Sequence, residues 1–158
     1  MLNKVSNGNI DYSKFKDLQE LPKPKKFNDF RNSLLNSPNC IKQINKNKII
    51  YQTKVGQVQI YIPYAYGHFA KNGKFGNGKE NRQDLTGVLN LILDKPAFVT
   101  KDTQGTLYFY KPFVINNEFK DVISISIDSN GKLEYRTTYE SSNTKVKNIM
   151  NHELVYIE

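Results

Sequence analysis

The sequence predicts an α+β fold in which helices pack on one antiparallel sheet of about four to five strands, preceded by an N-terminal extension. The clearest helix spans residues 85–93, where five apolar side chains recur at the 3.6-residue spacing of one helix face. Five short β-like runs follow it, separated by turn residues, so strands come after helices rather than alternating with them. The N-terminal extension is predicted from an excess of positive charge, because residues 1–54 hold 11 Lys/Arg against 4 Asp/Glu.

The first 47 residues are expected to form this basic extension. Asn, Lys and Ser dominate its start, and the two prolines of LPKPKK at residues 21–26 block helix and sheet donors, which is typical of a linker. Apolar residues from Phe27 to Leu35 then predict a short amphipathic helix that ends before Pro38. Residues 48–158 are therefore the expected folded domain.

Several runs within that domain predict strands. β-Branched and aromatic residues at 47–53 and 57–63 flank Gly56 and predict a hairpin, and the glycine-rich run at 72–81 predicts a loop. After the helix at 85–93, strand-forming runs lie at residues 97–101, 106–111, 122–128, 132–139 and 153–158.

The register of one late hairpin can be predicted. If residues 129–131 form a three-residue loop, Ile127 faces Leu133 on an apolar side of the hairpin. The opposite side then pairs Ser124 with Arg136, among other polar residues. That polar face either carries a site or simply faces water.

Length and composition predict a single soluble domain. The chain has 158 residues, a net charge of +8 and one cysteine, Cys40, which fits a reducing compartment. No apolar run approaches the roughly 20 residues of a membrane-spanning helix, and the N-terminus lacks the apolar stretch of a secretory signal. We therefore expect a protein that acts in the cytoplasm without a membrane partner; the sequence does not indicate its delivery route.

Two common chemistries are disfavoured. Residues 73–79 match the first seven positions of a phosphate-binding P-loop, but Glu80 stands where a Ser or Thr must hold magnesium, so a surface loop is favoured. His68 and His152 are the only histidines, and neither has a carboxylate or cysteine at ligand spacing. We therefore predict no metal and no cofactor.

His68 is the first candidate for chemistry. It lies beside Lys71, and further cations follow at Lys74, Lys79 and Arg82. RNA cleaves itself when a base removes the 2′-hydroxyl proton, an acid protonates the leaving 5′-oxygen and cations stabilise the crowded phosphorane. Imidazole, lysine and arginine suit these roles, although a purely structural histidine is the open alternative.

A second candidate cluster comprises Arg136, Thr137, Thr138 and Tyr139 near the end of a predicted strand. A cation and several hydroxyls at such a place could orient a phosphate or a base. Thr and Tyr are also ordinary strand formers, so packing alone is the alternative.

The order of these pieces carries a resemblance. A histidine on a helical segment is followed by a basic loop, Arg82 and the helix in DLTGVLNLILDKP, and then by FVTKD, LYFYKPF, VISISID and EYRTTYE. This order resembles the phage-associated barnase/EndoU/colicin/RelE-like (BECR-fold) nuclease families. The likeness covers about residues 58–157 and rests on pattern rather than on an invariant signature.

The resemblance implies a metal-independent, toxin-like endoribonuclease that cleaves RNA, such as tRNA, and leaves a 2′,3′-cyclic phosphate. It implies His68 as general acid or base, Arg82 on phosphate, and Thr138 with Tyr139 orienting the substrate. The expected substrate contacts are Lys71, Lys79, Lys111, Arg136 and Thr137. The glycine-rich insertion leaves the choice among the loop lysines open. The implied partners are RNA and a cognate inhibitor or immunity protein.

A rival function is a non-catalytic nucleic-acid- or protein-binding module, such as a phage accessory protein. It would use the basic extension and exposed aromatic side chains without chemistry. The excess of cations in the first 54 residues motivates it.

Overall fold

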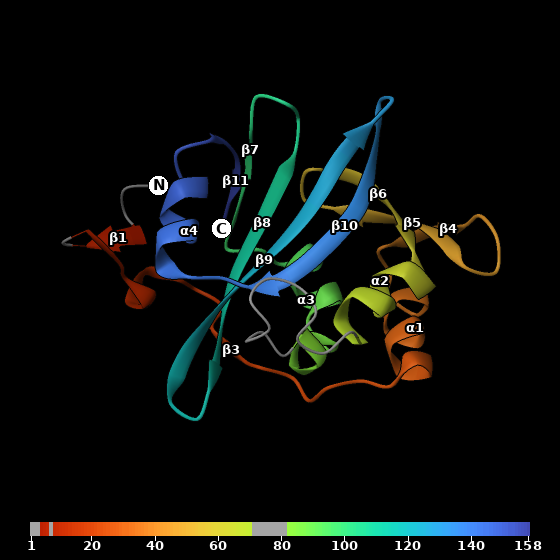
Figure 1. The fold of residues 1–158 in the computed structure, drawn as a ribbon, viewed down its shortest axis with the longest axis horizontal. Coiled ribbons are helices and arrows are strands. Elements are labelled where there is room, and N and C mark those ends of the chain that lie inside the picture. The colour runs from red at the N-terminus through yellow and green to blue at the C-terminus, as the bar shows by residue number, and fades with distance from the viewer. Residues whose placement is uncertain (1–3, 7, 71–81) are drawn as a thin grey trace.

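The computed structural model describes the chain except residues 1–3, 7 and 71–81 (Figure 1). Its strands are β1 (Val5–Ser6), β2 (Asn9–Ile10), β3 (Gln19–Glu20), β4 (Cys40–Gln43), β5 (Lys48–Thr53), β6 (Gly56–Tyr61), β7 (Phe98–Lys101), β8 (Leu107–Ile115), β9 (Glu118–Ser129), β10 (Lys132–Glu140) and β11 (Glu153–Ile157). Its helices are α1 (Phe27–Leu35), α2 (Ile62–Ala70), α3 (Leu89–Asp94) and α4 (Asn143–Ile149), with 3₁₀ turns η2 (Tyr12–Lys14) and η3 (Arg82–Leu85).

Within the described residues, nine strands form one curled sheet in the order β11-β7-β8-β9-β10-β6-β5-β4, and β3 pairs with β8 beside this path. Most neighbours are antiparallel, but β10 pairs with β6, and β3 with β8, in parallel. Strands β1 and β2 form a separate two-stranded ribbon. Both outer strands of the large sheet, β4 and β11, carry a register shift in their pairing.

The expected sheet of four to five antiparallel strands behind an N-terminal extension is therefore wrong. The sheet is larger and mixed, because β3 and β4 come from the first 47 residues and the β5–β6 hairpin joins the later strands. Strand β3 has only two residues, and β4 (Cys-Ile-Lys-Gln) does not alternate between apolar and polar side chains. Neither segment therefore shows a recognisable strand pattern in the sequence. The parallel β6–β10 pair links segments far apart in the chain, which local periodicity does not reveal.

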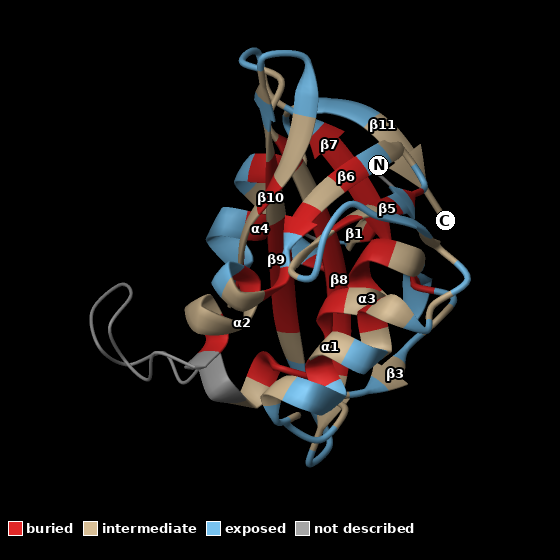
Figure 2. Ribbon diagram, turned by 90° about the vertical axis from the view of Figure 1, so that its right-hand side faces the viewer, coloured by how far each residue is buried: buried red, intermediate tan, exposed pale blue. Residues whose placement is uncertain are grey.

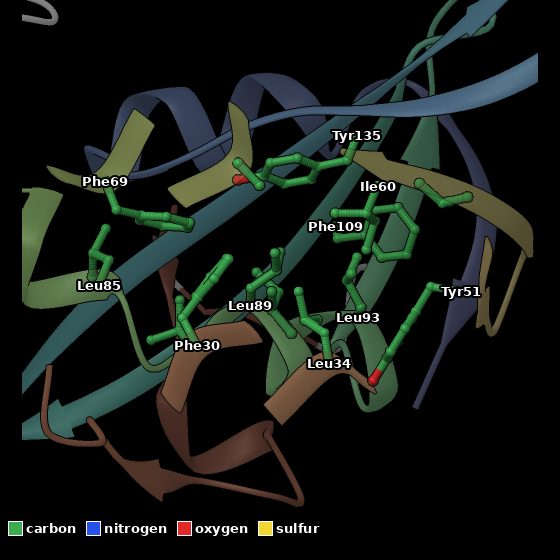
Figure 3. Close-up of a cluster of buried hydrophobic side chains, with 14 of the residues drawn as sticks. Phe30, Leu34, Tyr51, Ile60, Phe69, Leu85, Leu89, Leu93, Phe109 and Tyr135 are labelled. Atoms are coloured by element: carbon green, nitrogen blue, oxygen red, sulfur yellow. The ribbon is translucent and has the colours of Figure 1, made fainter. Parts of the chain in front are cut away.

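The sheet has a hydrophobic core on each face, because side chains alternate along each strand. Figure 2 shows many of the buried residues on the strands of the large sheet. The larger core lies between the sheet and helices α1, α2 and α3. Figure 3 shows ten of its labelled side chains converging, among them Phe30, Phe69 and Phe109. The smaller core lies under α4, where Val146 and Ile149 pack against Tyr110 and neighbouring residues.

The β9–β10 hairpin differs from its predicted register. Asn130 and Gly131 both have positive φ, at 54° and 82°, and Ser129 pairs with Lys132 across a two-residue turn. Asparagine tolerates this backbone region, so an Asn-Gly pair forms a type I′ turn rather than a three-residue loop. As a result Leu133 faces Asp128, and a bulge at Arg136 then shifts the pairing again.

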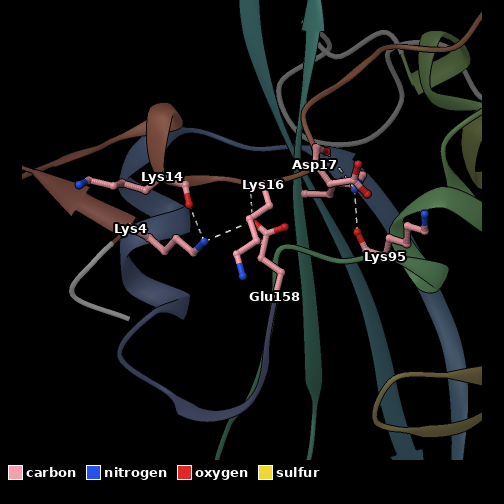
Figure 4. Close-up of polar contacts among 7 residues, drawn as sticks. Lys4, Lys14, Lys16, Asp17, Lys95 and Glu158 are labelled. Carbon is pink, nitrogen blue, oxygen red and sulfur yellow. Dashed lines mark hydrogen bonds and ion pairs between the residues drawn. The ribbon is translucent and has the colours of Figure 1, made fainter.

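The N-terminal segment is held against the domain by two buried lysines (Figure 4). The Lys4 ammonium donates to the Lys14 carbonyl at 2.7 Å and pairs with the Glu158 carboxylate at 3.2 Å. The Lys111 ammonium donates to the Lys95 carbonyl at 2.7 Å, at the end of α3, and lies 3.4 Å from the Asp17 carbonyl. Burial lowers the pKa of Lys111. The ammonium groups of both lysines therefore make contacts within the folded protein.

Two further contacts fix the same segment. The Tyr12 hydroxyl donates to the Asp121 carboxylate at 2.9 Å, and burial, reinforced by that carboxylate, raises the pKa of Tyr12 to about 12. Gly87 lies so close to the segment that a Cβ there would come 2.7 Å from the Lys23 carbonyl oxygen. Residues before position 47 thus pack directly on the later part of the chain.

Candidate nucleic-acid interface

A pocket lies in the fork between β6 and β10. The ladder between these parallel strands pairs Val58–Gln59 with Leu133–Glu134, and α2 begins directly after β6. The pocket has a volume of about 400 Å³. We call it the fork pocket, and its lining residues are Asn45, Lys48, Gln59, Tyr61, Tyr64, Glu134, Tyr135 and Arg136.

Strand alternation supplies much of this lining. Val58 and Ile60 of β6 are fully buried, so Gln59 and Tyr61 point to the opposite face of the sheet. On β10, Tyr135 is buried while the flanking Glu134 and Arg136 are partly exposed. The bulge at Arg136 bends the strand locally and redirects the side chain, which is a common role of bulges beside binding sites.

A turn before β5 fixes one cation of the pocket. The side-chain oxygen of Asn45 accepts hydrogen bonds from the backbone N–H groups of Asn47 and Lys48 at 2.9 and 3.0 Å. This local turn orients the start of β5. It places Lys48 opposite Tyr61 in the β5–β6 ladder, so a lysine and an exposed ring lie side by side.

Exposed aromatic rings and cations define the chemistry of the fork pocket. Tyr61 and Tyr64 are 50% and 39% exposed, although tyrosine usually buries most of its ring. Lys48 and Arg136 supply positive charge, and Glu134 is the one acidic residue among the described residues that line it. Rings of this kind stack on unpaired bases, and the cations suit phosphate.

His68 is next to this pocket. It lies one helical turn after Tyr64 on α2, and the two ring centroids are 4.4 Å apart. Helix α2 packs against β10, the strand that carries Arg136. Two residues singled out from the sequence, His68 and Arg136, are thus brought to one region through Tyr64.

Three other predicted residues cannot be placed at this site. Lys71 and Lys79 lie outside the described residues, and the side chain of Arg82 does as well. The backbone of Arg82 begins η3, which contacts both α2 and β10.

Thr138 lies in the interior, behind the fork pocket. It is fully buried, and its hydroxyl hydrogen-bonds the Tyr135 hydroxyl at 2.7 Å and donates to the Ser124 hydroxyl at 3.1 Å. Both bonds are made within the protein, so Thr138 supports Tyr135, a wall of the pocket, and does not face the pocket itself.

Replacing Thr138 by valine should destabilise the protein by about 1–3 kcal/mol, because the Tyr135 hydroxyl would lose a buried partner. Urea unfolding followed by circular dichroism measures this. Tyr135→Phe and Thr138→Val together should cost less than the sum of the two single losses, since both changes remove the same bond. Equal and additive losses from the two single changes would contradict the proposed bond.

The remaining predicted contacts lie elsewhere. Thr137 and Tyr139 follow the bulge at Arg136, and Tyr139 packs against the smaller core. Lys111 is 1% exposed and bonds backbone carbonyls, as described above. Thr137, Tyr139 and Lys111 are not among the described residues that line the fork pocket.

Sequence reasoning missed several pocket residues. Alternation along β6 predicts that Gln59 and Tyr61 share one face of the sheet, and this pattern could have identified them as neighbours. Their meeting with Glu134 and Arg136 depends on the parallel pairing of β6 with β10, which no local pattern specifies. Tyr64 joins them only because α2 starts immediately after β6.

The described residues, 4–6, 8–70 and 82–158, contain neither a metal-binding cluster nor a helix that could span a membrane. No group of three or more His, Cys, Asp or Glu side chains gathers there that could hold a metal ion. None of the described helices combines the length and apolar character needed to cross a membrane. No family model matches the chain, and neither does any curated protein or solved structure.

Proposed function

We propose that the chain is a metal-independent, toxin-like endoribonuclease that binds RNA at the fork pocket. One observation carries the proposal: Tyr64 lines the pocket together with Lys48 and Arg136, and its ring lies 4.4 Å from the His68 ring. A stacking surface, phosphate-binding cations and a titratable imidazole are the components that such a reaction requires.

The proposed reaction is an internal transesterification. A base removes the proton of the 2′-hydroxyl, the 2′-oxygen attacks the adjacent phosphorus, and the bond to the 5′-oxygen breaks as that oxygen gains a proton. The products are a 2′,3′-cyclic phosphate and a free 5′-hydroxyl. An imidazole can accept or donate a proton in such a reaction, so His68 is assigned one of the two proton transfers.

Cations have a separate role in this proposal. Negative charge accumulates on the phosphate oxygens in the transition state, and fixed positive groups stabilise it. Arg136 and Lys48 are the described candidates, and Lys71, Lys79 and Arg82 remain proposed phosphate contacts. The proposed partners are RNA in the cytoplasm and a cognate inhibitor protein.

Incubation with total RNA in excess EDTA should give discrete fragments that end in 2′,3′-cyclic phosphate. Arg136→Gln should lower kcat/KM at least about tenfold, because one charge-assisted phosphate contact is lost. Lys14→Gln is the matched control, since it removes an exposed cation of η2 away from the fork pocket. Loss of cleavage on chelation would contradict the metal-independent mechanism.

The second candidate function is a nucleic-acid-binding module without catalysis. The exposed Tyr61 and Tyr64 beside two cations favour it, because such a surface binds single strands without any reaction. Tight, salt-dependent binding of RNA that stays intact over long incubation would select this function over the nuclease.

A further inference from the structure

We propose that the RNA-binding surface continues from the fork pocket along β6 to the β9–β10 turn, so that the ligand is an extended single strand. This inference rests on the proposed RNA-binding function and names its substrate class. It concerns the length of single-stranded RNA that the protein contacts.

A second hollow adjoins the fork pocket and has a volume of about 340 Å³. The two share Gln59, and the second is lined by Ile50, Gln57, Gln59, Gly131, Lys132 and Leu133. They therefore form one path across the sheet, from Tyr64 on α2 to the turn that joins β9 to β10.

The length of this path follows from strand geometry. Gln57, Gln59 and Tyr61 alternate along β6 and so lie on one face. At about 3.3 Å per residue, Gln57 and Tyr61 are separated by about 13 Å. Gly131 and Lys132 line the end of the path beside Gln57, at the β9–β10 turn. A single nucleotide would leave much of such a path empty.

The chemistry of the path matches a single-stranded polyanion. Lys132, Lys48 and Arg136 are distributed along it, while Glu134 is the only acidic side chain among the described residues of the two linings. Gln57 and Gln59 offer amide donors and acceptors to sugars and base edges. The two exposed tyrosines stand at the α2 end, where they can stack only on bases that are not already paired.

An acidic protein segment is the other ligand that three cations could attract. It gives no role to the exposed Tyr61 and Tyr64, which supply flat π-faces rather than charge. The observations therefore favour the nucleic acid, and competition by polyglutamate separates the two.

Binding of labelled oligouridylates to the His68→Ala chain tests the length of the path without cleavage. A nonanucleotide should bind about tenfold more tightly than a trinucleotide, because only the longer strand reaches Lys132. Lys132→Gln should reduce that ratio to about threefold, whereas Lys14→Gln, on a remote exposed cation, should preserve it. Fluorescence anisotropy at one fixed salt concentration gives the affinities.

Three results would overturn the inference. These are equal affinity for the two lengths, equal affinity for a duplex of the same sequence, and competition by polyglutamate as effective as that by RNA. Cleavage by the unaltered chain is scored separately. Length-dependent binding without cleavage would contradict the nuclease proposal and support the extended path. Cleavage without length-dependent binding would support the nuclease proposal and contradict the extended path.

Discussion

Alanine in place of His68 should reduce RNA cleavage by about 10²–10⁴-fold, the range expected when a general acid or base is lost. The imidazole is adjacent to Tyr64, a lining residue of the fork pocket, and a neutral methyl group can transfer no proton. Single-turnover cleavage of a labelled RNA in EDTA measures the change. RNA affinity should change far less, because stacking and phosphate contacts remain.

His152→Ala is the matched control for this result. His152 is the only other histidine, and its ring stacks on Tyr108 with centroids 5.2 Å apart, in a region separate from the fork pocket. Its loss should leave the cleavage rate within about twofold. Full activity of the His68 variant, or an equal loss in both variants, would refute the assigned role of His68.

Phe30→Ala should lower the free energy of unfolding by about 3–5 kcal/mol. Phe30 is 1% exposed, and its ring packs 5.2 Å from Tyr66 and 5.8 Å from Phe69, measured between centroids. Truncation leaves a cavity at the centre of the larger core. Urea unfolding of the full chain measures this loss, and one cooperative transition is expected.

Phe27→Ala gives the comparison within the same helix. Phe27 is only partly buried and contacts Tyr66 at its edge, 5.4 Å between centroids, so its truncation should cost about 1 kcal/mol. If both changes cost this little, the first 47 residues would behave as the loosely attached extension that charge and prolines predicted. A large loss for Phe30 alone places them in the folded unit.

Local periodicity predicted much of the secondary structure. The helix expected from Phe27 to Leu35 is confirmed, and so are the β5–β6 hairpin and strand-forming segments from β7 to β11. The helix expected at 85–93 is confirmed only in part. Leu89, Ile92 and Leu93 lie on α3, whereas Leu85 ends a 3₁₀ turn. The chain turns at Thr86 and Gly87 between the two, where Gly87 meets the N-terminal segment.

Pairing between distant segments could not be predicted in the same way. Side-chain alternation indicates which face of a sheet a residue occupies, but not which strand lies next to its own. The pairing of β6 with β10 therefore could not be predicted from the sequence pattern. The residues of the candidate site could likewise be predicted only in part. Charge and residue type pointed to His68 and Arg136, whereas Thr138 and Lys111 proved to be interior groups with partners of their own.

The interruptions in the two outer strands affect how separate molecules meet. An open strand edge recruits another chain when its amide and carbonyl groups keep a regular spacing. The shift between Cys40 and Lys42 on one edge, and between Leu154 and Tyr156 on the other, breaks that spacing. Lys42 adds a charge where an incoming strand would dock. Irregular edges of this kind disfavour the addition of a further strand from another molecule.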